Sequence, residues 1–134
     1  MVNIFTVNFP FMKSLFPSIE PFNHFFLQTQ AHSVYVEQCG NPSGVPIVFL
    51  HGGPCSGCKP DHRRFFDPTY YHIILFDQRG CGRSLPFGEL EDNTLIHLIE
   101  DMEAIRKQLQ LENWILFGGS WGATLALALS LIHI

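Results

Sequence analysis

The residues with the clearest chemical meaning are Gly118-Gly119-Ser120-Trp121-Gly122, which fit the pattern G-x-S-x-G. The motif lies directly between an apolar run, Trp114–Phe117, and a longer apolar segment that continues to the end of the chain. A serine nucleophile needs such a strand–turn–helix setting, because it must project from a tight, strained turn. Bulky residues at positions 118 and 122 would collide in that turn. The N-terminal amides of the following helix would favour negative charge beside Ser120.

A second candidate loop is His51-Gly52-Gly53-Pro54, which follows the apolar run Pro46–Leu50. Gly52 and Gly53 suit a loop that lies against the serine turn and offers a backbone N–H to an oxyanion. The N–H of Trp121 would be the second donor. His51 is expected to hydrogen-bond within its own loop and to hold the loop in place.

A third segment runs from Asp77 to Ser84 and follows the apolar run His72–Phe76. Asp77 could itself be a nucleophile, but Ser120 already occupies that position. We therefore expect Asp77 and Arg79 to fix the loop as a buried charge pair that holds a glycine-rich turn.

The chain has four cysteines, and two of them form a C-x-x-C pair, Cys55 and Cys58. A structural zinc site usually needs a second pair of ligands. His62 leaves a weak metal site open, and a redox pair is also open. Free thiols are the favoured interpretation, and we expect no metal and no cofactor.

The elements that must position these residues alternate between strand and helix patterns, which favours an α/β fold. Alternating segments at Phe22–Gln30 and Ser33–Gln38 predict a hairpin. The three apolar runs named above predict strands buried on both faces. A helix is predicted after Asn93-Thr94, with one apolar stripe and a polar side. The stripe consists of Leu95, Leu98, Ile99, Met102, Ile105 and Leu109, and the polar side of Glu100, Asp101, Glu103, Arg106 and Lys107. A second helix, from near Trp121, is apolar on nearly all sides and is expected to be buried.

The composition is that of a core-forming protein, with 46% hydrophobic and 15% charged residues and a formal charge of −4. It shows no clustered basic face of the kind that nucleic-acid binding needs. The short basic run His62-Arg63-Arg64 is interpreted as a solvated loop. We find no signal peptide and no run of the ~18 apolar residues that a transmembrane helix needs. These features predict a cytoplasmic location without membrane or nucleic-acid partners.

Together, three blocks closely resemble the prolyl aminopeptidases (proline iminopeptidases), serine enzymes of the α/β-hydrolase superfamily. The blocks are Leu50–Pro54, Leu75–Ser84 and Phe117–Gly122. The resemblance extends over about residues 14–129 and implies an α/β-hydrolase fold that releases N-terminal proline from peptides. It also implies Ser120 as the nucleophile and Gly52, Gly53 and Trp121 as the oxyanion-hole loop and donors. In this superfamily the base follows the serine in sequence, which argues against His51 as the base.

The chain departs from the family pattern in several places. Cys55 stands where the family has glycine, a position where a positive φ would strain cysteine. The triad acid and histidine are missing, because His133 lies only thirteen residues beyond Ser120. We therefore interpret residues 1–13 as an N-terminal extension and 14–134 as a truncated domain: five strands up to the serine turn, without later strands or cap. Two alternatives stay open: another serine α/β-hydrolase, such as an esterase or C–C hydrolase, and a non-catalytic remnant.

Overall fold

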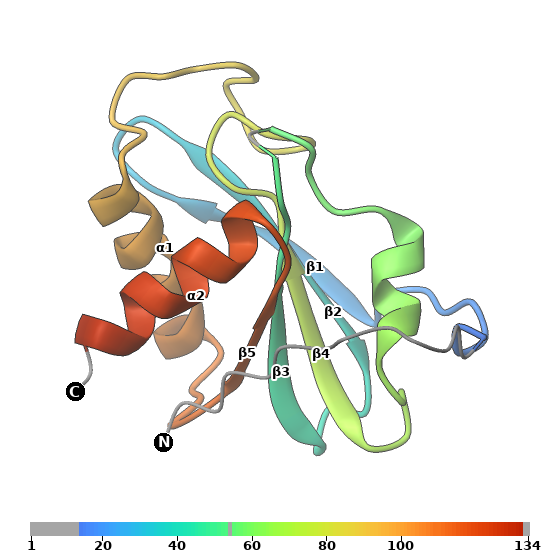
Figure 1. Ribbon diagram of the computed structural model, residues 1–134. Coiled ribbons are helices and arrows are strands. Elements are labelled where there is room, and N and C mark those ends of the chain that lie inside the picture. The colour runs from blue at the N-terminus through green and yellow to red at the C-terminus, as the bar shows by residue number, and fades with distance from the viewer. Residues whose placement is uncertain (1–13, 54, 133–134) are drawn as a thin grey trace.

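A five-stranded sheet forms the centre of the computed structural model, which describes residues 14–53 and 55–132 (Figure 1). The order of the strands across the sheet is β1-β2-β4-β3-β5. Their bounds are Asn23–Gln28 for β1, Ser33–Gly40 for β2, Val45–Leu50 for β3, Tyr71–Phe76 for β4 and Ile115–Gly118 for β5. All five predicted strands are confirmed, with boundaries shifted by one or two residues.

The pairing of the strands divides the sheet into two parts. β1 and β2 form the predicted antiparallel hairpin, and β2 continues antiparallel to β4. β3 runs parallel to β4 on one side and to β5 on the other. The carboxyl ends of β3, β4 and β5 therefore meet at one edge of the sheet, where the three loops singled out in the sequence begin.

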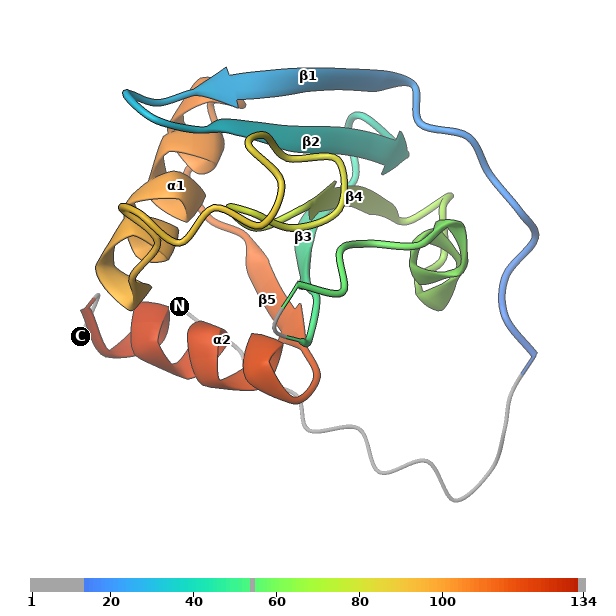
Figure 2. The same cartoon turned by 90° about the horizontal axis from the view of Figure 1, so that it is seen from above.

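Both faces of the central strands are buried, as their continuous apolar runs predicted. On β3, Val48 and Leu50 belong to one hydrophobic cluster, and Ile47 and Phe49 belong to another on the opposite face. This alternation follows from the two-residue period of a strand. Figure 2 shows the helices α1 and α2 on one side of the sheet and a short 3₁₀ helix on the other.

Helix α1 (Leu95–Gln108) begins after Thr94, as predicted from the cap residues. The middle of its apolar stripe is buried, whereas Leu95 at the first turn is 39% exposed. The assignment of Asp101 to the polar side is wrong, because this residue is 2% exposed. Its burial is explained by a partner outside the helix, the guanidinium of Arg79.

Helix α2 (Trp121–Ile132) buries one side only. Leu125 and Leu129 are in the core, but Leu127 and Leu131 are 51% and 61% exposed. The expectation of an all-round buried helix is therefore wrong within the described part of the chain. β5 beside it pairs only with β3 among the described strands, so its other edge carries no strand there.

The short 3₁₀ helix spans Pro60–Phe65 and was not predicted. Its residue Arg63 is 7% exposed and donates to both carboxylate oxygens of Glu37, at 2.7 and 3.0 Å. The interpretation of this basic run as a solvated loop is wrong for Arg63. The basic run does not indicate this burial, because the partner of Arg63 is Glu37 on β2, 26 residues earlier.

The α/β fold class predicted from the sequence is confirmed by this architecture. Within residues 14–53 and 55–132, no helix is both long and apolar enough to cross a membrane. The proposed extension 1–13 and His133 lie outside the described residues.

Candidate active site

Ser120 occupies the turn between β5 and α2 in a backbone conformation that L-amino acids rarely adopt, with φ of +56°. The turn is closed by backbone hydrogen bonds, including one from the N–H of Gly122 to the carbonyl of Gly119 at 3.0 Å. A side chain at position 118 would come within 2.5 Å of Gly122, and one at position 122 within 2.0 Å of the Leu50 carbonyl oxygen. Only glycine fits at both positions, and Ser120 itself is exposed. The geometry is that of a strained turn presenting a hydroxyl to solvent.

Gly52 lies directly against this turn. A Cβ added to Gly52 would be 3.2 Å from the carbonyl oxygen of Gly119 and 3.9 Å from the Oγ of Ser120. Gly53 follows with φ of +141°. No described backbone carbonyl accepts a hydrogen bond from the N–H of Gly53 or of Trp121. Their role as oxyanion donors stays a prediction.

The imidazole of His51 is buried, and both of its ring nitrogens have hydrogen-bond partners. Its Nε2 accepts a hydrogen bond from the backbone N–H of Gln78 at 3.0 Å, and its Nδ1 lies 2.8 Å from the carbonyl oxygen of Gly52. The consistent tautomer is neutral, with Nδ1–H donating to Gly52. Desolvation by burial lowers the pKa of His51, which also favours the neutral ring. With both nitrogens engaged, His51 holds the loop and is not placed to accept a proton from Ser120.

Gln78 connects all three loops, and the sequence analysis did not single it out. Its side-chain amide donates to the His51 carbonyl oxygen at 2.9 Å and accepts from the indole N–H of Trp121 at 3.0 Å. The residue is 3% exposed. The only signal in the sequence was its position beside Asp77, because the partners of Gln78 are 27 and 43 residues away.

Asp77 and Arg79 both fix loops, but they do not form a pair with each other. The fully buried carboxylate of Asp77 accepts hydrogen bonds from the backbone N–H groups of Cys58 and Arg83, at 2.7 and 2.9 Å. The Arg83 guanidinium also donates to it at 2.8 Å. These contacts hold the pKa of Asp77 below its ordinary value against the opposing effect of desolvation, the largest single influence. The expected single charge pair is therefore corrected to two separate ones.

Arg79 forms the second pair, with Asp101 on α1. Its Nε and a terminal nitrogen donate to the two carboxylate oxygens at 2.6 and 2.8 Å. Another terminal nitrogen donates to the carbonyl oxygen of Asp92 at 2.6 Å. This bidentate contact anchors the loop after β4 to the helix.

The cysteines do not form a metal site in the described part of the chain. No group of three or more potential ligands among His, Cys, Asp and Glu is found there. The thiol of Cys58 donates to the carbonyl oxygen of Phe76 at 3.2 Å. Cys55 has the positive φ, +67°, that the sequence analysis expected to strain a residue other than glycine.

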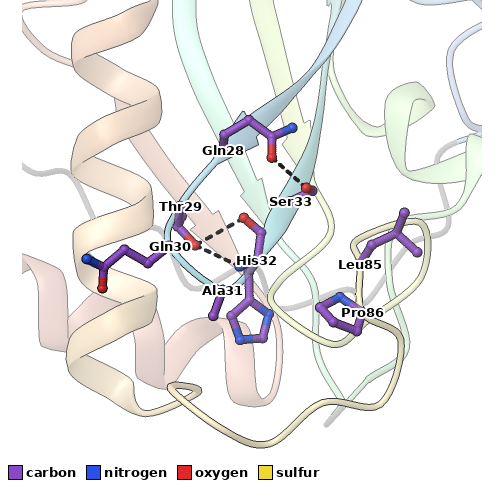
Figure 3. Close-up of a pocket in the computed structure, with 8 residues that line it drawn as sticks. All are labelled: Gln28, Thr29, Gln30, Ala31, His32, Ser33, Leu85 and Pro86. Atoms are coloured by element: carbon purple, nitrogen blue, oxygen red, sulfur yellow. Dashed lines mark hydrogen bonds between the residues drawn. The ribbon is translucent and has the colours of Figure 1, made fainter.

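A cavity of about 380 Å³ lies away from Ser120, at the tip of the β1–β2 hairpin (Figure 3). It is lined by residues 28–33, Leu85 and Pro86. Within it, the hydroxyl of Thr29 donates to the carbonyl oxygen of His32 at 3.0 Å and accepts from the His32 backbone N–H at 2.9 Å. None of the predicted site residues lines this cavity, so it is separate from the serine site.

A family model described as the alpha/beta hydrolase fold matches residues 45–133. The match contains all three loops, including the strained serine turn. The chain therefore belongs to the α/β-hydrolase fold family. The predicted fold class is confirmed for that part of the fold which the 134 residues contain.

Curated relatives make the resemblance more specific. The chain is 50% identical over 123 residues to a probable proline iminopeptidase of Leptolyngbya boryana, covering 91% of this chain and 38% of that protein. It is 51% identical to a proline iminopeptidase of Arabidopsis thaliana, covering 90% of this chain and 32% of that one. The resemblance to the proline iminopeptidases is thus confirmed. The chain spans about a third of the length of these relatives.

Solved structures agree on the fold. A proline iminopeptidase-related protein of Thermus thermophilus superposes with a TM-score of 0.70 at 26% identity, over 81% of this chain and 39% of that one. A putative epoxide hydrolase of Pseudomonas aeruginosa superposes with a TM-score of 0.66 at 29% identity, over 91% of this chain and 40% of that one. Neighbours with different named activities share this part of the fold, so the fold alone does not select a substrate.

Proposed function

We propose that this chain carries the nucleophile and oxyanion loop of a serine aminopeptidase that releases proline from the N-terminus of peptides. The observation that carries the proposal is the position of Ser120, exposed at φ +56° on the glycine-bounded turn, with Gly52 packed against it. The proline specificity rests on the relatives, which are named proline iminopeptidases and are 50% and 51% identical in sequence to this chain.

In this proposal the Oγ of Ser120 attacks the carbonyl carbon of the first peptide bond. The negative charge that develops on the carbonyl oxygen is stabilised by the backbone N–H groups of Gly53 and Trp121. A single donor of this kind typically contributes ~3 kcal/mol of transition-state stabilisation. Gln78 keeps both donors in place, because it is hydrogen-bonded to His51 in one loop and to Trp121 in the other.

Among the residues that the structure describes, no side chain is assigned as the acceptor of the Ser120 proton. His51 has both ring nitrogens engaged, and the sequence after Ser120 contains no Asp or Glu and one histidine, His133. Without base and acid, oxyanion donors and binding leave only a small residual acceleration. We therefore expect this 134-residue polypeptide by itself to be inactive. The cytoplasmic location and the lack of nucleic-acid partners also stay predictions.

Another serine α/β-hydrolase, such as an esterase or C–C hydrolase, is the second candidate. The superposition on a putative epoxide hydrolase shows that this part of the fold is not restricted to one reaction. A non-catalytic remnant is the third candidate, and the missing base and acid favour it for the chain taken alone.

The test compares hydrolysis of proline-4-nitroanilide, alanine-4-nitroanilide and 4-nitrophenyl acetate. Two proteins are assayed: the 134-residue chain, and a polypeptide in which these residues are followed by the remaining two thirds of a relative's sequence. Release of nitroaniline from the proline substrate by the longer protein alone is expected. Ser120→Ala is expected to abolish it.

Ser43→Ala is the matched control, because Ser43 is exposed in the turn before β3, at the end of the strand opposite the site. It should leave the activity unchanged. Cleavage of the ester without release of proline would favour the second candidate. Ser120-dependent turnover by the 134-residue chain would contradict its expected inactivity.

A further inference from the structure

The carbonyl oxygen of Gly52 is held by two side chains of its own loop. The hydroxyl of Ser56 donates a hydrogen bond to it at 2.7 Å, and the Nδ1 of His51 lies 2.8 Å from it. We propose that Ser56 is a positioning residue, which fixes the orientation of the peptide group between Gly52 and Gly53. The inference rests on the proposed role of the Gly53 N–H as an oxyanion donor.

The Gly52 carbonyl and the Gly53 N–H belong to the same peptide group. This group is planar and trans, so its C=O and N–H bonds point in nearly opposite directions. A donor that holds the carbonyl oxygen therefore also sets the direction of the N–H. No described backbone carbonyl accepts a hydrogen bond from the Gly53 N–H, so no such bond sets its direction from the other side.

This peptide group needs a restraint because a glycine stands on each side of it. Gly52 has no side chain, which is what allows the loop to lie against the serine turn, and Gly53 has φ of +141°, a value that favours glycine. A peptide between two glycines can turn over at low steric cost. Turned over, it would present a carbonyl oxygen where the N–H had been, and the partial negative charge of that oxygen would oppose the developing oxyanion.

The backbone after Gly53 folds back sharply and brings Ser56 to the Gly52 carbonyl. A Cβ added to Gly53 would be 2.6 Å from the nitrogen of Cys55 and 3.1 Å from the nitrogen of Ser56. The far end of this turn is anchored, because the backbone N–H of Cys58 donates to the buried carboxylate of Asp77 at 2.7 Å. The Ser56 hydroxyl is therefore presented from a turn that is itself fixed.

The two donors differ in how they can be tested. A carbonyl oxygen has two lone pairs, so it can accept from both side chains at once. His51 is buried and also accepts from the Gln78 N–H, so its replacement would disturb the packing between two loops. Ser56 is exposed, and its hydroxyl can be removed without opening the core.

The first experiment observes the hydrogen bond by NMR of the 134-residue chain, labelled with glycine that carries ¹³C in its carbonyl group and ¹⁵N. The chain contains two Gly-Gly pairs, Gly52-Gly53 and Gly118-Gly119, so two amide nitrogens are bonded to a labelled carbonyl carbon. Gly119→Ala assigns the two signals, because a Cβ there meets nothing within 4 Å. Ser56→Ala should move the Gly52 carbonyl signal upfield, since a carbonyl that loses a hydrogen bond is less deshielded. The Gly118 carbonyl signal should stay in place.

The second experiment measures hydrolysis of proline-4-nitroanilide by the longer polypeptide described above. Ser56→Ala should lower kcat ~2- to 10-fold, the factor equivalent to one net hydrogen bond. KM and the melting temperature should not change, because the oxyanion contact forms only in the transition state. Ser56→Thr keeps the hydroxyl and should restore both kcat and the carbonyl signal. Ser43→Ala, the matched control, should change neither.

Several results would overturn the proposal. They are an unchanged Gly52 carbonyl signal in Ser56→Ala, an unchanged kcat, and a Ser56→Thr variant as slow as Ser56→Ala. A loss that appears in KM alone would overturn it too, since it would place Ser56 in substrate binding. If the longer polypeptide cleaves only 4-nitrophenyl acetate, the proline specificity fails, and the same kcat comparison is then made with the ester. The carbonyl signal tests the hydrogen bond without any turnover.

Discussion

Removal of the Asp101 carboxylate is expected to destabilise the fold more than any change at a surface charge. Arg79 and Asp101 are 6% and 2% exposed, and the guanidinium and carboxylate share two hydrogen bonds of 2.6 and 2.8 Å. Asp101→Ala leaves the Arg79 charge buried with one remaining acceptor, the carbonyl oxygen of Asp92. Breaking a buried pair from one side typically costs about 3–5 kcal/mol. Against a net stability of about 5–15 kcal/mol, this loss is a large share of the margin, and only at the lower end of that range would it unfold a large fraction of the molecules.

The measurement is equilibrium urea unfolding, followed by fluorescence of Trp114, which is buried, and Trp121, with all variants at one protein concentration. Asp61→Ala is the matched control, because it removes a carboxylate 3.1 Å from Arg64 where the two side chains are 70% and 29% exposed. An exposed pair contributes about 0–1 kcal/mol.

A double variant, Arg79→Met with Asp101→Leu, removes both charges and should recover most of the lost stability. A loss for Asp101→Ala no larger than the loss for Asp61→Ala would refute the reasoning. So would a double variant as unstable as the single one, because the cost would then lie in lost packing and not in an unpaired charge.

Three further results are expected. Gly122→Ala places a Cβ 2.0 Å from the Leu50 carbonyl oxygen and should lower the unfolding free energy by at least ~2 kcal/mol, measured by the same urea assay; an unchanged midpoint would show that the turn can relax. Burial lowers the pKa of both His51 and His72 below 6.5, so the unfolded chain takes up protons first as the pH falls. Stability present above pH 6.5 should therefore decrease toward pH 5, by at most ~1.4 kcal/mol per pH unit for each histidine, and a flat urea midpoint over this range would contradict the shifts. The free edge of β5 and the exposed face of α2 should make the 134-residue chain self-associate in sedimentation velocity, with Leu127→Glu reducing the association; a monodisperse monomer would argue against it.

Local patterns in the sequence were sufficient to predict the five strands and the two α-helices. The apolar runs that became β3 and β4 are buried on both faces, and this burial removes the polar alternation that a half-exposed strand would show. In β5 only Leu116 is buried, so the expected burial on both faces is wrong for that strand within the described residues. The helix α1 followed from its apolar stripe. The short 3₁₀ helix at Pro60–Phe65 was missed, because its six residues are too few to show a period.

The partners of the charged residues could not be predicted in the same way. Arg63, Asp77 and Asp101 all looked like loop or surface residues, and each is buried with a partner far along the chain or with backbone N–H groups of other loops. A periodic pattern reports which face a residue occupies, but not which distant charge can neutralise it there.

The sequence by itself determined the serine turn, because its geometry depends on neighbours within a few residues. Ser120 has its strained φ between glycines at positions 118 and 122, and a side chain at 118 would meet Gly122 within the same five residues. The need for glycine at 122 is set by the Leu50 carbonyl oxygen on β3, which is a tertiary contact. Tertiary structure alone decided what surrounds that turn: Gln78 hydrogen-bonds to His51 and to Trp121, and Asp77 accepts hydrogen bonds from Cys58 in the loop after β3 and from Arg83 in the loop after β4. The physical reason is that parallel strands bring their carboxyl ends to one edge of the sheet, and residues tens of positions apart become neighbours there.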